Sequence, residues 1–416
     1  MKYKKISFDN YDLYYIKKDK FKTITVNTLF INDYSKTNIT KEKVISEYLV
    51  NTCKECDNEI LMSKKFLELY EPNIGIYDYF SDKHTKSFLL NFLNDKFTEK
   101  GMNKKTLDFY YDIVFNPNAK DGKFDKSNLD ISKRKLITRS KLQREDSSFC
   151  AYFNAMGQIK DNIPIAIDTR LKESYIRKVD PKEAYEYYVD RIKSSKVIVF
   201  VVGDIDDEFF KIIESNLKNK IKKNDYELIN RYNLSKVKKE REIIKETTFN
   251  QSILFMVYKF INITERERLV VLPIFNNILG GSSSKLFKNV REKHSLVYYA
   301  HSNSYSSQSI LFIEAGIESK NYKKTVTVIK EQMNEMINGN ITDKEINGTK
   351  ESLYSGLYEI DDDERSILNN LCGVVLDNLY YYEDLKKEYE SVTKEELINL
   401  GKKIELDFIH LSKGVN

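Results

Sequence analysis

Two sequence patterns recur about half a chain apart in this 416-residue protein. A Ser-Lys-x-Phe segment that opens a helix ahead of a hairpin begins at Ser63 and again at Ser284, 221 residues later. A capped helix followed by a strand begins at Asp180 and again at Thr393, 213 residues later. Because two independent pairs share nearly the same offset, we predict a duplicated domain. A chain of this length can also supply a core to each of two domains.

Each copy mixes helical and strand patterns. Residues 21–31 alternate with a period of two, which is typical of a half-buried strand, and residues 40–51 place apolar side chains at helical spacing. Residues 87–93 fit a hairpin of long strands, and residues 129–153, which lack Gly and Pro, predict one extended helix. Residues 196–203 predict a buried strand. We therefore expect an α+β protein of two structurally similar domains, each an antiparallel-rich sheet covered by helices.

The second copy carries the same signals. Residues 297–306 and 309–317 predict another hairpin, and Thr393 with Glu396 forms a capping box ahead of a strand at residues 407–411. The expected boundaries are 1–222 for the N-terminal domain, 223–238 for a linker and 239–416 for the C-terminal domain. The stretch around the linker is rich in Lys and Asn and could contact nucleic acid or a membrane. Asp and Glu interrupt its basic run, which favours a solvated linker.

Composition argues against several classes of protein. The net charge of +5 is spread along the chain without a long block of one sign, so we expect no nucleic-acid partner. Cys53 and Cys56 form a lone Cys-x-x-Cys, which we interpret as two small residues near a helix end rather than as a redox or zinc site. The N-terminus has no apolar signal-peptide core, and the longest strongly apolar run, residues 197–202, is far too short for a membrane span. We expect a cytoplasmic protein without a membrane partner.

Histidine is scarce. The chain has His84, His294, His301 and His410, and no two of them are three to five residues apart. A helical zinc site built from two histidines therefore cannot form. His294 lies three residues from Arg291 and could serve as a base, but a lone His at a helix end more often interacts with the helix dipole.

Two segments relate the chain to a known family. Residues 44–51 read Val-Ile-Ser-Glu-Tyr-Leu-Val-Asn on the helix after the first strand, and residues 280–298 run from a Gly-Gly pair to an Arg-x6-Tyr element. With these segments the chain resembles, over essentially its whole length, the pitrilysin-type zinc peptidases, the inverzincin group that includes the mitochondrial processing peptidases. The resemblance implies a LuxS/MPP-like metallohydrolase fold with its two domains arranged as a clamshell.

The zinc motif of this family is degenerate here. Active members carry His-x-x-Glu-His on the first helix, where both histidines bind zinc and the Glu polarises the bound water. At these positions the chain has Glu47, Val50 and Asn51: both histidines are missing, the base is a valine, and Asn51 offers only a neutral amide. A further zinc-binding Glu would fall within residues 132–144, which contain no carboxylate. We expect no metal ligand and no catalytic residue in this chain.

The second motif of the family is retained. The resemblance implies that Arg291 and Tyr298 hold the peptide main chain and stabilise charge on the scissile carbonyl at a zinc site in the other half of the clamshell. Arg291 offers a planar fork of donors and Tyr298 a phenolic donor on a rigid ring. The alternative is a surface Arg at a helix end with a Tyr packed in a strand. Tyr299 could also be the phenol, since neighbouring strand residues face opposite sides.

The resemblance also implies a partner. The family includes heterodimers in which one subunit supplies zinc and base, and the chain is most similar to the zinc-lacking partner in bacterial operons associated with elongation factor P modification. Peptide-bacteriocin maturation proteins have similar halves. We therefore expect a non-catalytic subunit of a heterodimeric zinc peptidase, with zinc held by a pitrilysin-type paralogue and a peptide or protein as substrate. The alternative is a non-enzymatic scaffold or peptide-binding protein that keeps only the fold.

Overall fold

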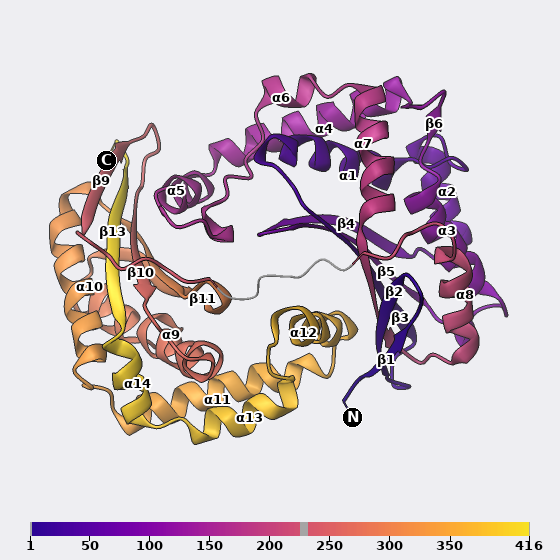
Figure 1. Ribbon diagram of the computed structural model, residues 1–416. Helices are drawn as coiled ribbons and strands as arrows, with labels where there is room; N and C mark the ends of the chain where they lie inside the picture. The colour runs from indigo at the N-terminus through magenta and orange to yellow at the C-terminus, as the bar shows by residue number, and fades with distance from the viewer. Residues whose placement is uncertain (1, 225–231, 416) are drawn as a thin grey trace. The chain divides into compact units, whose positions relative to one another are not determined.

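The computed structural model describes residues 2–224 and 232–415 (Figure 1), and these residues form two compact units. Unit 1 consists of Met1–Leu142, Thr169–Leu228 and Asp363–Cys372, and unit 2 consists of Gln143–Asp168, Ile229–Asp362 and Gly373–Asn416. Each unit therefore contains one short segment that comes from the other half of the sequence. Residues 225–231 of the expected linker lie outside the described residues, so the expected domain boundaries stay predictions.

Unit 1 is built on one six-stranded sheet. Its strands are β1 (Lys4–Ser7), β2 (Tyr11–Lys17), β3 (Thr23–Asn32), β4 (Asn73–Phe80), β5 (His84–Leu93) and β8 (Lys196–Gly203). They lie in the order β1-β2-β8-β3-β5-β4, in which β2 and β8 are parallel and all other neighbours antiparallel. β8 has the predicted bounds, and all its residues after Lys196 are buried because the strand lies inside the sheet.

Helices cover this sheet. The helices of unit 1 are α1 (Ile39–Asn51), α2 (Glu59–Glu68), α3 (Met102–Phe115), α4 (Lys126–Glu145, which ends in unit 2), α6 (Glu173–Arg177), α7 (Pro181–Ser194) and α8 (Asp207–Leu217). A small ribbon of β6 (Ala119–Lys120) and β7 (Lys123–Phe124) follows α3. Val44 and Tyr48 of α1 are fully buried in the core together with Val26 of β3. α7 begins at the predicted cap, where the Asp180 carboxylate accepts hydrogen bonds from two backbone N–H groups.

The single helix expected over residues 129–153 is wrong, because α4 is followed by a separate helix, α5 (Ser147–Met156). The side chain of Asp146 accepts a hydrogen bond from the backbone N–H of Phe149 at 3.0 Å and so caps α5. α5 packs Ala151 and Ala155 in one apolar cluster with Phe255 and Phe312 of unit 2. This packing explains why residues 143–168 belong to unit 2.

Unit 2 repeats the sheet of unit 1. Its strands are β9 (Arg241–Glu246), β10 (Ser252–Phe260), β11 (Val297–Tyr305), β12 (Ile310–Ile317) and β13 (Ile404–Lys413). The order β9-β13-β10-β12-β11, with only β9 and β13 parallel, matches β2-β8-β3-β5-β4 strand for strand. The predicted α+β fold of two similar, antiparallel-rich domains is therefore confirmed.

The helices of unit 2 complete its core. Besides α5, they are the π-helix η4 (Glu267–Val271), α9 (Leu272–Gly280), the π-helix η5 (Leu286–Lys293), α10 (Tyr322–Ile337), α11 (Asp343–Ile360), α13 (Tyr382–Ser391) and α14 (Lys394–Gly401). The predicted capping box of Thr393 and Glu396 begins α14. None of the helices in the described residues has the length and hydropathy that a membrane crossing requires.

One helix has residues in both units. α12 (Glu364–Asp377) begins in the segment Asp363–Cys372, which belongs to unit 1. The buried carboxylate of Glu364 accepts hydrogen bonds from Thr23, Thr25 and Asn91 of the unit 1 sheet, at 2.6, 3.2 and 2.9 Å. A segment distant in sequence is thus joined to the strands of unit 1.

Candidate functional site

The residues at the zinc-motif positions, Glu47, Val50 and Asn51, which we call the degenerate motif, lie in the last turns of α1. They are half-buried, whereas Tyr48 and Leu49 between them are fully buried in the core. Glu47 and Asn51 are one turn apart, and the Asn51 side-chain amide donates to the Glu47 backbone oxygen at 2.5 Å. The helix therefore places Glu47 and Asn51 one turn apart on the same face, with side chains that bind zinc poorly.

Two cations from α4 contact the degenerate motif. Arg139 Nη1 lies 3.0 Å from Glu47 Oε2, and Lys135 Nζ donates to Asn51 Oδ1 at 3.1 Å. Lys135 also pairs with Glu59 at 2.6 Å. One carboxylate oxygen of Glu47 and the amide oxygen of Asn51 are therefore held by positive charges, and none of the three motif positions carries a His or a Cys. The residues do not fit a zinc ion.

The sequence showed that residues 132–144, where a zinc-binding Glu is expected, contain no carboxylate, but it did not indicate a role for Lys135 and Arg139. These two residues have the same i, i+4 spacing as Glu47 and Asn51. That matched spacing, together with the loss of both histidines, was the sequence signal that could have indicated two cations paired with the degenerate motif.

A second cluster of charges lies at the other end of α1. It comprises Glu42 of α1, Asp78 of β4, His84 and Lys86 of β5, and Arg191 of α7, and we call it the buried network. His84 bridges the two acids, with Nδ1 3.2 Å from Glu42 and Nε2 2.7 Å from Asp78. The ligand atoms of Glu42, Asp78 and His84 all lie within 4.8 Å of one another, as a metal site would require.

Lys86 occupies the position between these two acids. Its ammonium lies 3.2 Å from Glu42 and 2.6 Å from Asp78. Burial alone would raise the pKa of Glu42, but the charge of Lys86 and the hydrogen bond from His84 outweigh it and lower the pKa to about 2. The same two groups hold the pKa of Asp78 well below its usual range. The buried network is therefore a compensated set of ion pairs, and a metal would have to displace Lys86.

The Cys-x-x-Cys pair lies in unit 1. Cys53 and Cys56 are free thiols buried just after α1, and the Cys53 N–H donates to the Cys56 oxygen at 2.8 Å. Burial raises the pKa of the Cys53 thiol to about 12. A thiol with such a pKa carries little thiolate and is a poor nucleophile.

The retained motif lies in unit 2, on the connection from α9 through η5 to β11. A Cβ added to Gly280 would lie 2.1 Å from Ser302 Oγ and 2.2 Å from the Ser302 nitrogen. Only glycine therefore allows the last turn of α9 to approach β11 so closely. The close approach lies just before η5, the helix that carries Arg291.

Arg291 and Tyr298 are exposed at the two ends of this connection. The Arg291 guanidinium lies over the Phe287 ring, 5.3 Å from its centroid. Tyr298 is the extra residue of a β-bulge, because Val297 pairs with Ile317 and Tyr299 with Gly316. Its side chain is 57% exposed, and its hydroxyl is 3.5 Å from Glu318.

Tyr299 differs from its neighbour in its contacts. Its hydroxyl donates to Glu314 at 2.9 Å, its ring stacks on His301 with 5.8 Å between centroids, and burial raises its pKa well above the usual range. A hollow of about 430 Å³ adjoins both tyrosines and is also lined by Gln251 and Glu318. Of the two phenols, Tyr298 is the one left accessible.

Comparison with known proteins bears on the family. Residues 178–353 match the family model described as the peptidase M16 inactive domain. The chain is 27% identical over 413 residues, 96% of its own length and 95% of the relative's, to the probable inactive metalloprotease YmfF of Bacillus subtilis strain 168. By these matches the chain is similar to inactive homologues of the M16 peptidases. The family expected from the sequence motifs is confirmed.

Solved structures share the fold of this M16 homologue. A conserved protein from Enterococcus faecalis V583 matches with a TM-score of 0.89 and 23% identity, over 100% of this chain and 99% of that one. A peptidase M16 inactive domain protein from Pseudomonas fluorescens matches with a TM-score of 0.80 and 15% identity, over 100% and 99% of the two chains. The segment that matches the family model includes Arg291 and Tyr298, whereas the degenerate motif precedes it.

Proposed function

We propose that this M16 homologue is the non-catalytic subunit of a heterodimeric zinc peptidase. In this proposal a pitrilysin-type paralogue supplies the zinc and the general base, and this chain supplies Arg291 and Tyr298 to the substrate. The supporting observation is a contrast between the two motif sites. The oxygens of the degenerate motif are held by cations from α4, whereas the retained pair is exposed and has few partners.

The polar groups of the retained pair are available for a peptide. In the part of the chain that the structure describes, the Arg291 guanidinium makes no hydrogen bond or ion pair, so all five of its N–H donors can reach carbonyl or carboxylate oxygens. The Tyr298 hydroxyl has one long contact, at 3.5 Å. The adjoining hollow of about 430 Å³ suits a side chain of a bound peptide. A peptide or protein substrate is therefore part of the proposal.

The cellular setting of the proposal rests on the charge distribution and apolar runs of the sequence, and its pathway rests on the family resemblance. We place the heterodimer in the cytoplasm, with neither a nucleic-acid nor a membrane partner. Elongation factor P modification and peptide maturation are both compatible pathways. The zinc of the complex is assigned to the partner subunit.

The test is reconstitution with a paralogue from the same genome that carries His-x-x-Glu-His. The purified pair should cleave peptides, and Arg291→Ala should lower kcat/KM by about 10²–10³-fold, the range for losing one donor to a developing oxyanion. Tyr298→Phe should also lower kcat/KM. Tyr299→Phe is the matched control, because the Tyr299 hydroxyl is already held by Glu314, and it should leave kcat/KM within about twofold of wild type.

The second candidate function is a non-enzymatic scaffold or peptide-binding protein that retains only the fold. The cations that fill the degenerate motif favour it, because they are compatible with a chain that never takes part in zinc chemistry. A pair that forms but is inert, or whose activity is unaffected by Arg291→Ala and Tyr298→Phe, would support the scaffold. One equivalent of zinc in the isolated chain by elemental analysis would contradict our interpretation of the degenerate motif.

A further inference from the structure

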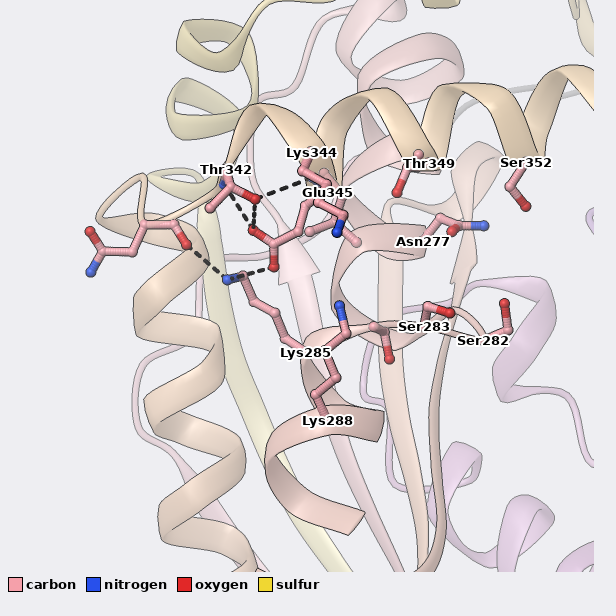
Figure 2. A pocket seen from close by; sticks show the side chains of 14 residues that line it. Asn277, Ser282, Ser283, Lys285, Lys288, Thr342, Lys344, Glu345, Thr349 and Ser352 are labelled. Carbon is pink, nitrogen blue, oxygen red and sulfur yellow. Dashed lines mark hydrogen bonds and ion pairs between the residues drawn. The ribbon is translucent and has the colours of Figure 1, made fainter. Parts of the chain in front are cut away.

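Unit 2 contains a cavity of about 600 Å³ that neither Arg291 nor Tyr298 lines (Figure 2). Its walls are the end of α9, the turn of Ser282, Ser283 and Ser284, the start of η5, and one face of α11. The volume lies within the range of small-molecule sites, which is about 300–1,000 Å³.

One pair of charges in the wall is internally compensated. Glu345 forms the capping box of α11 with Thr342, accepting from its backbone N–H at 2.8 Å. Lys285 lies 3.1 Å from Glu345 and donates to the backbone oxygen of Asn340 at 2.8 Å. Figure 2 shows these contacts as dashed lines at one end of the cavity. Lys285 and Glu345 therefore leave no net charge for a ligand.

Two further lysines of the wall remain unpaired. Lys288 of η5 and Lys344 of α11 are exposed, and the ammonium of neither has a hydrogen bond or ion pair in the described part of the chain. Figure 2 shows the ends of their side chains directed toward one another, from η5 and from α11. Glu345 is the one acidic residue among the described residues of the wall. The cavity thus carries two positive charges that no protein group balances.

The rest of the wall supplies neutral hydrogen-bonding groups. Ser282, Ser283 and Ser352 offer exposed hydroxyls, and Asn277 offers an amide. Lysine ammonium and hydroxyl groups are common donors to phosphate oxygens, and such donors also bind the hydroxyls of a sugar. No arginine, the residue suited to bidentate capture of a carboxylate, is among the described lining residues.

The face of α11 also leaves room for a ligand. Gly348 lines the cavity in the interior of α11, where a Cβ would meet nothing within 4 Å. Glycine lowers the stability of a helix interior, and at this position it leaves the space beside α11 open. We propose that the cavity binds a small phosphorylated molecule of nucleotide or sugar-phosphate size, with Lys288 and Lys344 on its phosphate. This site does not depend on the proposed heterodimer.

The test uses the full chain and pyrophosphate as the probe, measured by isothermal titration calorimetry at low ionic strength. Pyrophosphate should bind, and the Lys288→Ala/Lys344→Ala variant should weaken the affinity at least about tenfold, since each lysine contributes a charge-assisted contact. The matched control is Lys323→Ala/Lys324→Ala, which removes two exposed lysines of α10 that do not line the cavity. The control should bind with wild-type affinity.

A second variant separates loss of charge from loss of folding. Gly348→Leu keeps every lysine and improves helix propensity, but its side chain enters the cavity, so it should abolish binding while thermal unfolding stays at or above that of wild type. The proposal is overturned if pyrophosphate does not bind, or if either cavity variant binds like wild type. It is also overturned if a tetra-aspartate peptide binds more tightly than pyrophosphate, because the ligand would then be an acidic peptide.

Discussion

Lys86→Met should lower the free energy of unfolding of unit 1 more than other lysine substitutions on its surface. Lys86 is 3% exposed, and its ammonium serves Glu42, Asp78 and the hydroxyl of Ser46, the last at 2.6 Å. Methionine approximates the length and volume of the lysine stem, so the substitution removes the charge without opening a large cavity. Two buried carboxylates are then left without their shared cation.

The magnitude follows from the contacts that survive. Removing one member of a buried ion pair costs about 3–5 kcal/mol. Glu42 would keep the Tyr187 hydroxyl at 2.6 Å, His84 at 3.2 Å and the Arg191 guanidinium at 3.5 Å, and Asp78 would keep His84 and Ser46. Because each carboxylate retains donors, we expect the lower end of that range, about 3 kcal/mol.

The assay is equilibrium unfolding in urea at neutral pH, with Lys104→Met as the control. Lys104 forms an exposed i, i+4 ion pair with Asp108 on α3 of the same unit, and such pairs contribute less than about 1 kcal/mol. A Lys86→Met midpoint close to that of Lys104→Met would refute the view that Lys86 compensates the buried network. Adding Glu42→Gln to Lys86→Met should recover part of the loss, since it removes one of the two buried carboxylate charges that shared Lys86.

Three further predictions concern pH, backbone and metal. The buried network lowers the pKa of Glu42 to about 2 from an ordinary value near 4.3. The stability that this lowered pKa gives the folded protein should be complete above about pH 4.5 and lost as the pH falls toward 2. In thermal unfolding, the midpoint of Lys86→Met should fall less over this pH range than that of wild type. Gly280→Ala should lower the free energy of unfolding by about 1–3 kcal/mol, because the new Cβ meets the backbone of Ser302. Gly348→Ala should raise it by about 0.5–1 kcal/mol, because its Cβ meets nothing and alanine favours a helix. Equal urea midpoints for the two variants would contradict this. The third prediction uses a variant in which the degenerate motif is replaced by His-x-x-Glu-His. In that variant, Arg139→Glu should strengthen zinc binding at least about tenfold in a chelator competition. An unchanged zinc affinity would show that the charge of Arg139 does not oppose metal binding there.

Local chemistry made much of the fold predictable. The apolar run at residues 196–203 and the cap at Asp180 indicated β8 and the start of α7, because a buried strand and an N-cap are specified by adjacent residues. The cap at Asp146 was missed, since a single Asp within a polar, helix-compatible stretch does not stand out from the pattern. The assignment of residues 143–168 and 363–372 to the opposite units rests on long-range packing that no local pattern encodes.

The candidate site was predictable mainly in what it lacks. The degenerate motif was visible from the family pattern, because each missing ligand has a defined position. The contacts that replace zinc were not visible, since Lys135 and Arg139 reach α1 from a helix about ninety residues away. The accessibility of Tyr298 depends on a bulge in β11, and regular alternation cannot reveal an extra residue in a strand.

The exchanged segments determine when each unit becomes complete during synthesis of the chain. Glu364 and its neighbours, which join the strands of unit 1, emerge from the ribosome only after residues 229–362 of unit 2 have been made. A nascent N-terminal half therefore lacks a piece of its own unit, although domains usually fold as units as they are made. In the same way, cutting the gene at the expected linker would give two fragments, each without a segment held by the other. Each unit is therefore complete only when both halves of the chain are present, although the two sheets match.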